Sequence, residues 1–427
     1  CAQAGTRPAW SCLAHHAALV DQGDALLLPN VRQEEAPLPV LGKGHLAVRE
    51  AVSTYLRGLG IKTHASHLWL GYSPLVMFTQ SVQTLTQRGD TVLVLTPCDP
   101  RITSTLQSLG RQVVALSAGE RGVDLDLVVR CLRDKPVRLI VLPGQFSFPA
   151  GQLISNLSLR RGCAIIEETK LPVIEWDLCS HLAYRAGSVM TYKSLDSSDH
   201  IVYIGGVESK EAGRSASWCV PGRHQALLEG AFLSADMALN DGQQQALSDA
   251  LQSDSKRSLT RRARDVWANA ERIKAHLEAR LGHHVSFVTS KGGLSLWVFL
   301  STPLPSTRLT ALLASFRHAI VPGALVSHEA DADHWLAVNV TLDDVEPLAK
   351  ALAEHLAVDA LVTDEAATDD LSDQAQADDQ DDKTEMVEAI ESDLASPDSR
   401  VTESKSQSAT TEPLYNPMLD LINHDFG

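Results

Sequence analysis

The sequence has few aromatic residues, no long apolar run and almost no excess of charge outside its C-terminal region. Aromatic residues make up 5% of the 427 residues, and no stretch of 18 apolar residues occurs, so we expect no membrane-spanning helix. The net charge is −16, but 18 acidic residues after residue 360 carry nearly all of it. The remainder lacks the basic surface that neutralises phosphates, which argues against direct nucleic-acid binding by this part of the chain.

The cysteines form no recognisable pattern. There are seven of them, an odd number, and no Cys-x-x-Cys pair occurs. This spacing disfavours both a disulfide framework and a zinc site. It suits a reducing compartment, so we expect a cytoplasmic protein.

Short apolar runs alternate with helical patterns through the first half of the chain. Runs of this kind are typical of buried parallel strands, and the segments between them carry the apolar spacing of helices. The expected strands are 91–97, 112–118, 137–143, 163–168 and 200–206, and the expected helices are 45–58, 101–109 and 124–133. The pattern predicts an α/β fold with a mostly parallel sheet covered on both faces.

Composition divides the chain into four parts. Residues 1–40 form an irregular lead-in segment, and 41–240 form the large sheet domain. Residues 241–358 are expected to form a smaller α+β domain. The acidic tail, 359–427, has few large apolar residues and is predicted to be disordered. Its end, around 416–422, is interpreted either as a short docking helix or as a solvated terminus.

Five segments resemble one family in the family's order. They are GKGHLAVREAVSTYLRGLGI (42–61), RGDTVLVLTP (88–97), FPAG (148–151), CAIIEE (163–168) and IVYIGGVESKEAGR (201–214). Together they resemble the class I/II aminotransferases of fold type I, which depend on pyridoxal 5'-phosphate (PLP). The variants are most similar to the MocR subgroup of transcriptional regulators, in which a GntR-type winged helix-turn-helix precedes an aminotransferase-like domain. The resemblance implies a homodimer, with DNA bound only through a winged-helix domain that would precede residue 1 and is absent from this chain.

The resemblance also assigns cofactor residues. Lys210 occupies the position of the lysine that forms an imine with PLP. Glu168 stands where the family has the aspartate that pairs with the pyridine nitrogen. Ser73, Ser209 and Arg214 are the expected phosphate ligands.

Three further positions depart from the family pattern. Asp99 replaces the aromatic residue that stacks on the cofactor ring, and Pro74 has no N–H to offer to the phosphate. Ala337, within Leu336-Ala337-Val338, replaces the arginine that binds the substrate carboxylate. These changes predict that catalysis is weakened or lost.

Three functional hypotheses follow. The leading one is a degenerate, PLP-binding effector domain of a MocR/GntR-type regulator that responds to a small amino-acid-like or cofactor ligand. The alternative is an active PLP-dependent aminotransferase or lyase. The third is a cofactor-free interaction protein that uses the acidic tail.

Overall fold

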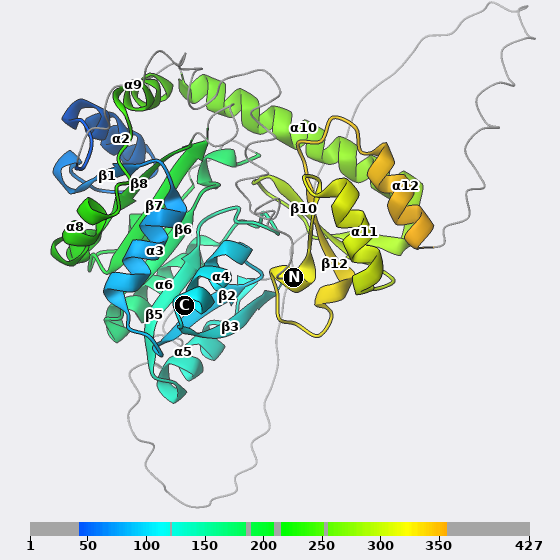
Figure 1. Ribbon diagram of the computed structural model, residues 1–427, viewed down its shortest axis with the longest axis horizontal. Helices are drawn as coiled ribbons and strands as arrows, with labels where there is room; N and C mark the ends of the chain where they lie inside the picture. Colours follow the sequence, from blue (N-terminus) through cyan, green and yellow to red (C-terminus); the bar gives the residue numbers. More distant parts are fainter. Residues whose placement is uncertain (1–41, 120–121, 185–188, 209–214, 252–254, 357–427) are drawn as a thin grey trace, which may run out of the picture. The chain divides into compact units, whose positions relative to one another are not determined.

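The computed structural model describes residues 42–119, 122–184, 189–208, 215–251 and 255–356 (Figure 1). A large sheet has the strand order β1-β8-β7-β6-β5-β2-β3-β4, in which β2, β3, β5, β6 and β7 run parallel. Strand β8 is antiparallel to both β1 and β7, and β4 is antiparallel to β3. The predicted mostly parallel sheet is therefore confirmed. The strands are β1 (Trp69–Gly71), β2 (Thr91–Thr96), β3 (Gln112–Gly119), β4 (Gly122–Val123), β5 (Val137–Pro143), β6 (Val173–Asp177), β7 (Ile201–Glu208) and β8 (Ser215–Val220).

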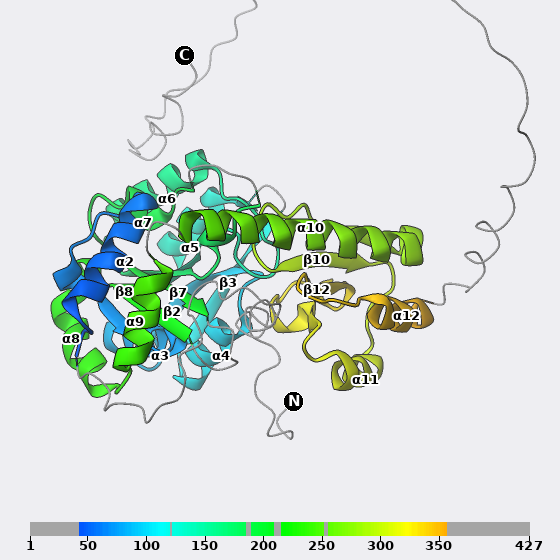
Figure 2. The ribbon, with the colours of Figure 1, turned by 90° about the horizontal axis from the view of Figure 1, so that it is seen from above.

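Helices cover both faces of this sheet, as Figures 1 and 2 show. One face packs against α3 (Pro74–Leu85), α4 (Pro100–Ser108) and α8 (Gln225–Ser234). The other face packs against α2 (Leu46–Gly58), α5 (Leu125–Asp134), α6 (Asn156–Thr169), α7 (Tyr192–Leu195) and α9 (Asp241–Ala250). Apolar residues on both faces explain why the central strands read as continuous apolar runs.

One strand prediction is wrong. Residues 163–168 belong to α6, which begins after Ser155, and the Ser155 side chain accepts a hydrogen bond from the Ser158 N–H at 3.1 Å. The strand comes after this helix, as β6, and it is buried along its whole length. A short apolar run fits a buried helix face as well as a strand, and here the cap and the helix length decide for the helix.

A second sheet is antiparallel throughout, with the order β11-β12-β10-β9. Its strands are β9 (Val285–Phe287), β10 (Ser295–Leu300), β11 (Ile320–Pro322) and β12 (Trp335–Asn339), and its helices are α10 (Ser255–Leu281), α11 (Ser306–Phe316) and α12 (Glu346–His355). A small α+β unit therefore follows the large sheet, and it begins with α10, because α9 packs against the large sheet. No helix in the described ranges is both long and apolar enough to cross a membrane.

Two capped helices begin at one edge of the large sheet. Ser73 follows β1 and caps α3, with its Oγ accepting from the Val76 N–H at 3.4 Å. Asp99 follows β2 and caps α4, with its carboxylate accepting from the Arg101 N–H at 2.9 Å. Each cap is followed by a proline at the first helical position, where a missing N–H costs nothing. The carboxyl edge of the sheet thus carries polar side chains at fixed positions.

Candidate functional site

The residues expected to hold the cofactor are only partly described. Ser209, Lys210 and Arg214 lie outside the described residues. Strand β7 ends at Glu208, immediately before them, and pairs in parallel with β6. The acid expected to pair with the pyridine nitrogen of PLP would come from a strand next to β7. Among the described residues, that place is the carboxyl end of β6.

Glu168 does not lie at a strand end. It is exposed in the last turn of α6, five residues before β6 begins. The expectation that a strand carries this acid to the carboxyl edge of the sheet is wrong, because the segment is helical. Ser73 does lie beside that edge, where its hydroxyl caps α3.

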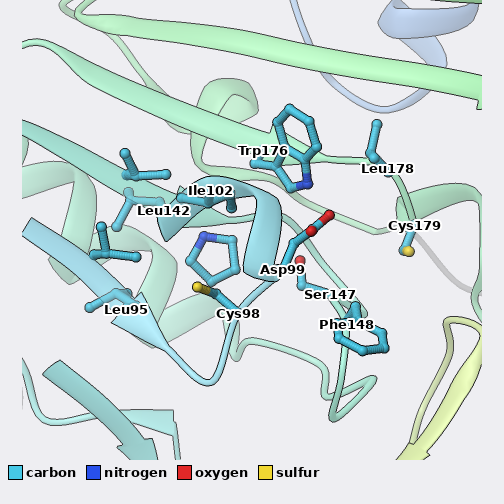
Figure 3. Close-up of a pocket in the computed structure, with 13 residues that line it drawn as sticks. Leu95, Cys98, Asp99, Ile102, Leu142, Ser147, Phe148, Trp176, Leu178 and Cys179 are labelled. Atoms are coloured by element: carbon cyan, nitrogen blue, oxygen red, sulfur yellow. The ribbon is translucent and has the colours of Figure 1, made fainter. Parts of the chain in front are cut away.

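A small cavity lies at the carboxyl edge of the sheet (Figure 3). It is bounded by the ends of β2, β5 and β6, with Cys98, Asp99, Phe148, Trp176 and Leu178 among its walls. Its volume is about 20 Å³, which is room for about one water molecule. Burial raises the pKa of the Cys98 thiol, with a smaller effect from Asp99, so this thiol stays protonated and is no nucleophile.

Trp176 fills the part of this edge that β6 presents to α3 and α4. Its side chain is 3% exposed, and its ring meets that of Phe78 edge-on at 5.6 Å. The Arg101 guanidinium lies over the indole at 5.4 Å from the ring centroid, within cation–π range. The cavity is small because this indole and its neighbours occupy the space.

Asp99 holds the Arg101 guanidinium in place. Arg101 donates from Nη2 to the Asp99 carboxylate at 2.6 Å and from Nε at 3.1 Å, while the two side chains are 12% and 2% exposed. A fork of this kind is a strong and directional ion pair. Asp99, Arg101 and Trp176 are hereafter called the Trp176 stack.

The Trp176 ring nitrogen is an exception to the good packing of this stack. Its Nε1–H is buried and has no hydrogen-bond partner within the described part of the chain. A buried donor in this state costs about 1–3 kcal/mol. Among the described residues, the indole is therefore held by packing and by Arg101.

The carboxylates of β6 point to the opposite face of the sheet. Asp177 accepts hydrogen bonds from the Tyr203 hydroxyl at 2.9 Å and from the Ser180 hydroxyl and N–H at 2.5 and 3.0 Å. Glu175 accepts from the Tyr192 and Lys193 N–H groups at 3.0 and 2.7 Å. Strand alternation places both acids on the α7 side and Trp176 on the cavity side.

Both acids are fully buried, and their pKa values rise. Loss of hydration raises the pKa of Glu175 to about 8, and the nearby Asp177 carboxylate adds to this. Burial also raises the pKa of Asp177, although donors from Ser180 and Tyr203 lower it. Asp177 receives more hydrogen bonds than Glu175. We therefore assign the negative charge to Asp177 and a bound proton to Glu175 at neutral pH.

The small sheet closes the same region with apolar side chains. Ala337 of β12 is fully buried and pairs in register with Trp297 of β10, and the Trp297 ring stacks on Trp335 at 5.2 Å. Trp297 and Ala337 belong to the same core as Phe148, at the carboxyl edge of the large sheet. The position expected to carry a carboxylate-binding arginine is thus part of a hydrophobic core.

The described residues do not fit PLP. The cavity between the ends of β2, β5 and β6 has room for about one water molecule, so a PLP ring would enter it only if side chains such as Trp176 moved away. On β6, Trp176 stands on the cavity side, and the carboxylates lie on the other face. Pro74 also removes one N–H from the start of α3.

The comparisons with known proteins agree with the predicted resemblance. No protein-family model matches the chain. The HTH-type transcriptional regulator YdfD of Bacillus subtilis, described as uncharacterized, is 24% identical over 320 residues, which are 73% of this chain and 65% of that protein. The 2-aminoadipate transaminase of Thermus thermophilus is 23% identical over 299 residues, covering 66% of this chain and 75% of that protein. The chain spans less than two thirds of the length of the curated regulators that it matches.

Solved structures show the same fold. LysN, the α-aminoadipate aminotransferase of Thermus thermophilus complexed with N-(5'-phosphopyridoxyl)-L-leucine, has a TM-score of 0.66 at 19% identity, covering 81% of this chain and 88% of LysN. The kynurenine aminotransferase of Pyrococcus horikoshii in complex with PMP also has a TM-score of 0.66, at 18% identity, covering 83% of this chain and 95% of that one. The fold-type-I aminotransferase fold is therefore confirmed.

Sequence reasoning missed Trp176, Arg101 and the buried pair of acids on β6. The segment 172–177 carried a usable signal, because a proline followed by an apolar run with two acids two residues apart fits a buried strand end. The pairing of Asp99 with Arg101 had no comparable signal. It depends on the turn that begins α4, which places side chains two residues apart against one another.

Proposed function

We propose that the chain is the aminotransferase-like effector domain of a MocR/GntR-type transcriptional regulator, and that this domain no longer catalyses amino-group transfer. The observation that carries the proposal is the Trp176 stack at the carboxyl edge of the sheet, where ligands bind in open α/β folds. Similarity to regulators and to aminotransferases supports the same assignment. DNA would be bound by a winged-helix domain outside this chain, in the cytoplasm.

Turnover of amino acids tests the loss of catalysis. Purified protein mixed with PLP, common amino acids and a 2-oxo acid is expected to form no product above the uncatalysed background, because Ala337 provides no cation for the substrate carboxylate. Typical enzymes turn over at about 1–1,000 s⁻¹. A rate in that range would favour the active aminotransferase or lyase instead.

The visible spectrum tests the predicted cofactor and ligand independently of turnover. An imine of Lys210 with PLP would absorb near the edge of the visible range, and the band would disappear in Lys210→Ala.

The regulatory part is tested by recovering DNA with the full-length protein from cells. Enrichment of a few upstream regions is expected, and recovery no better than that of an unrelated protein would contradict the regulatory role.

A second copy of this chain is the partner that α8 fits. The inner face of α8 is buried through Leu228 and Phe232, and Phe232 meets Trp69 edge-on at 5.4 Å. Its outer face also carries leucines, Leu227 and Leu233, which are 63% and 55% exposed. A helix that is apolar on both sides is normally buried on both sides. Helix α8 lies beside edge strand β1 at one end of the sheet (Figure 1), and we propose that a homodimer covers it.

Charge on the outer face of α8 is expected to separate the two copies. The double variant Leu227→Lys/Leu233→Lys should elute and scatter light as a single chain of 46.2 kDa, with the wild type at twice that mass. The matched control is Leu153→Lys/Leu157→Lys, because those leucines are 53% and 52% exposed near the start of α6. If the α8 double variant keeps the mass of the wild type, α8 does not form the interface.

A further inference from the structure

We propose that Trp176 is an internal occupant of the ring site. The indole fills the carboxyl-edge pocket, Arg101 covers one face of the ring, and no pyridoxal-type ligand enters while they are in place. If the Trp176 side chain is removed by substitution, the space that it leaves would accept a free planar aromatic molecule of indole size. This inference rests on the proposed function only in placing the ring site at this edge of the sheet.

The position of the indole is fixed by the strand that carries it. Trp176 is the last residue of β6 to face α3 and α4, one residue before the strand ends at Asp177. It pairs in parallel register with Pro143 of β5 and Ile204 of β7, so it lies in the middle of the sheet. Figure 3 shows the ring at the pocket, on the same side as Asp99. A large side chain here blocks the centre of the carboxyl edge.

The contacts around Trp176 resemble those that hold a bound aromatic ligand. One ring face receives the guanidinium of Arg101 at 5.4 Å, and an aromatic edge from Phe78 approaches at 5.6 Å. Both are directional attractions that any flat π-system of this size would receive. Asp99 fixes the guanidinium through its paired hydrogen bonds. The surrounding groups are therefore ordered by partners other than the indole.

The unused N–H of Trp176 points to the same conclusion. Nε1 is buried without a partner among the described residues, so the described side chains contact the shape and π-surface of the ring and not its donor. Removing the side chain would leave an enclosed space with apolar walls and a cation above it. Enclosed apolar cavities bind small aromatic molecules, and the guanidinium would add a cation–π contact to a molecule bound here.

Indole binding to Trp176→Ala tests the inference. Free indole at about a hundred times its Kd should raise the thermal midpoint of Trp176→Ala by about 5 °C and should not affect the wild type. The matched control is Trp176→Phe, which keeps a ring in the pocket and should also show no shift. If Trp176→Ala does not fold, Trp176→Leu leaves a smaller gap and is tested with benzene in the same way.

Two results would overturn the inference. A folded Trp176→Ala, or Trp176→Leu in its place, whose midpoint does not respond to its aromatic molecule would show that no ring-shaped space was vacated. An imine band from PLP in the wild-type protein would show that the ring enters with Trp176 present. The imine band would not contradict the proposed function if the wild-type protein still shows no turnover of amino acids. Turnover in a variant that also binds indole would contradict the proposed function alone.

Discussion

Arg101→Met is expected to lower the free energy of unfolding by about 3–5 kcal/mol, which is the usual effect of removing one partner of a buried ion pair. The Asp99 side chain is 2% exposed, so its charge would lose the guanidinium at 2.6 Å without reaching bulk water. The Trp176 ring would lose its cation–π contact as well. Urea unfolding followed by circular dichroism measures the change.

The control for this prediction neutralises Asp99. Asn at position 99 keeps an oxygen that can cap α4, where the carboxylate now accepts from the Arg101 N–H. The double variant Asp99→Asn/Arg101→Met should therefore recover much of the stability lost in Arg101→Met, because no buried charge remains. A loss in Arg101→Met below about 1 kcal/mol, the range of exposed pairs, would mean that the pair contributes little. If the double variant is as unstable as Arg101→Met, the loss of stability comes from the lost packing against Trp176 and not from an unpaired charge on Asp99.

The strands and helices of the large-sheet region could be predicted because the sequence signals for them are local. Strands such as Thr91–Thr96 are short, apolar and bounded by turn residues, and helices such as Leu125–Asp134 begin at a polar cap. The error at 163–168 arose because the apolar residues there fit the spacing of a helix as well as that of a strand. The length of α6 and its Ser155 cap could have resolved it, but a family resemblance favoured a strand.

The candidate site was predictable only through its departures from a family pattern. Asp99 and Ala337 were singled out because the resemblance expects an aromatic residue and an arginine there, and the structure places both residues in buried positions. The occupant of the pocket was not predictable in this way. Side chains alternate between the two faces of a strand, and this alternation places Trp176 at the site. The face on which it lies is known only when the bounds of β6 are known. Contacts between α4 and β6 bring Arg101 to it from 75 positions away in sequence, which no local pattern encodes.

Glu175 is expected to make the stability of the wild-type chain fall as the pH rises from about 4.5 to about 8. The folded chain holds the Glu175 proton up to a pKa of about 8, whereas the unfolded chain releases it near the ordinary value of 4.5. Between these values the folded state binds more protons, so raising the pH favours unfolding. The full contribution is present below pH 4.5 and is lost as the pH passes 8. At about 1.4 kcal/mol per pKa unit, the loss is about 5 kcal/mol.

The variant Glu175→Gln removes this titration, because the amide is neutral at every pH. Its NH2 group faces one of the two N–H groups from which Glu175 accepts, which lowers the stability by the same amount at every pH and leaves the pH-dependent difference to the titration. Its stability relative to the wild type should therefore increase steadily between about pH 5 and pH 8 and change little above that, as measured by urea unfolding at fixed pH steps. The control Glu168→Gln makes the same chemical change at an exposed position on α6, and its curve should run parallel to the wild type. If Glu175→Gln also runs parallel, then Glu175 is ionised in the folded chain at neutral pH. The proton would then be assigned to Asp177, whose pKa burial also raises.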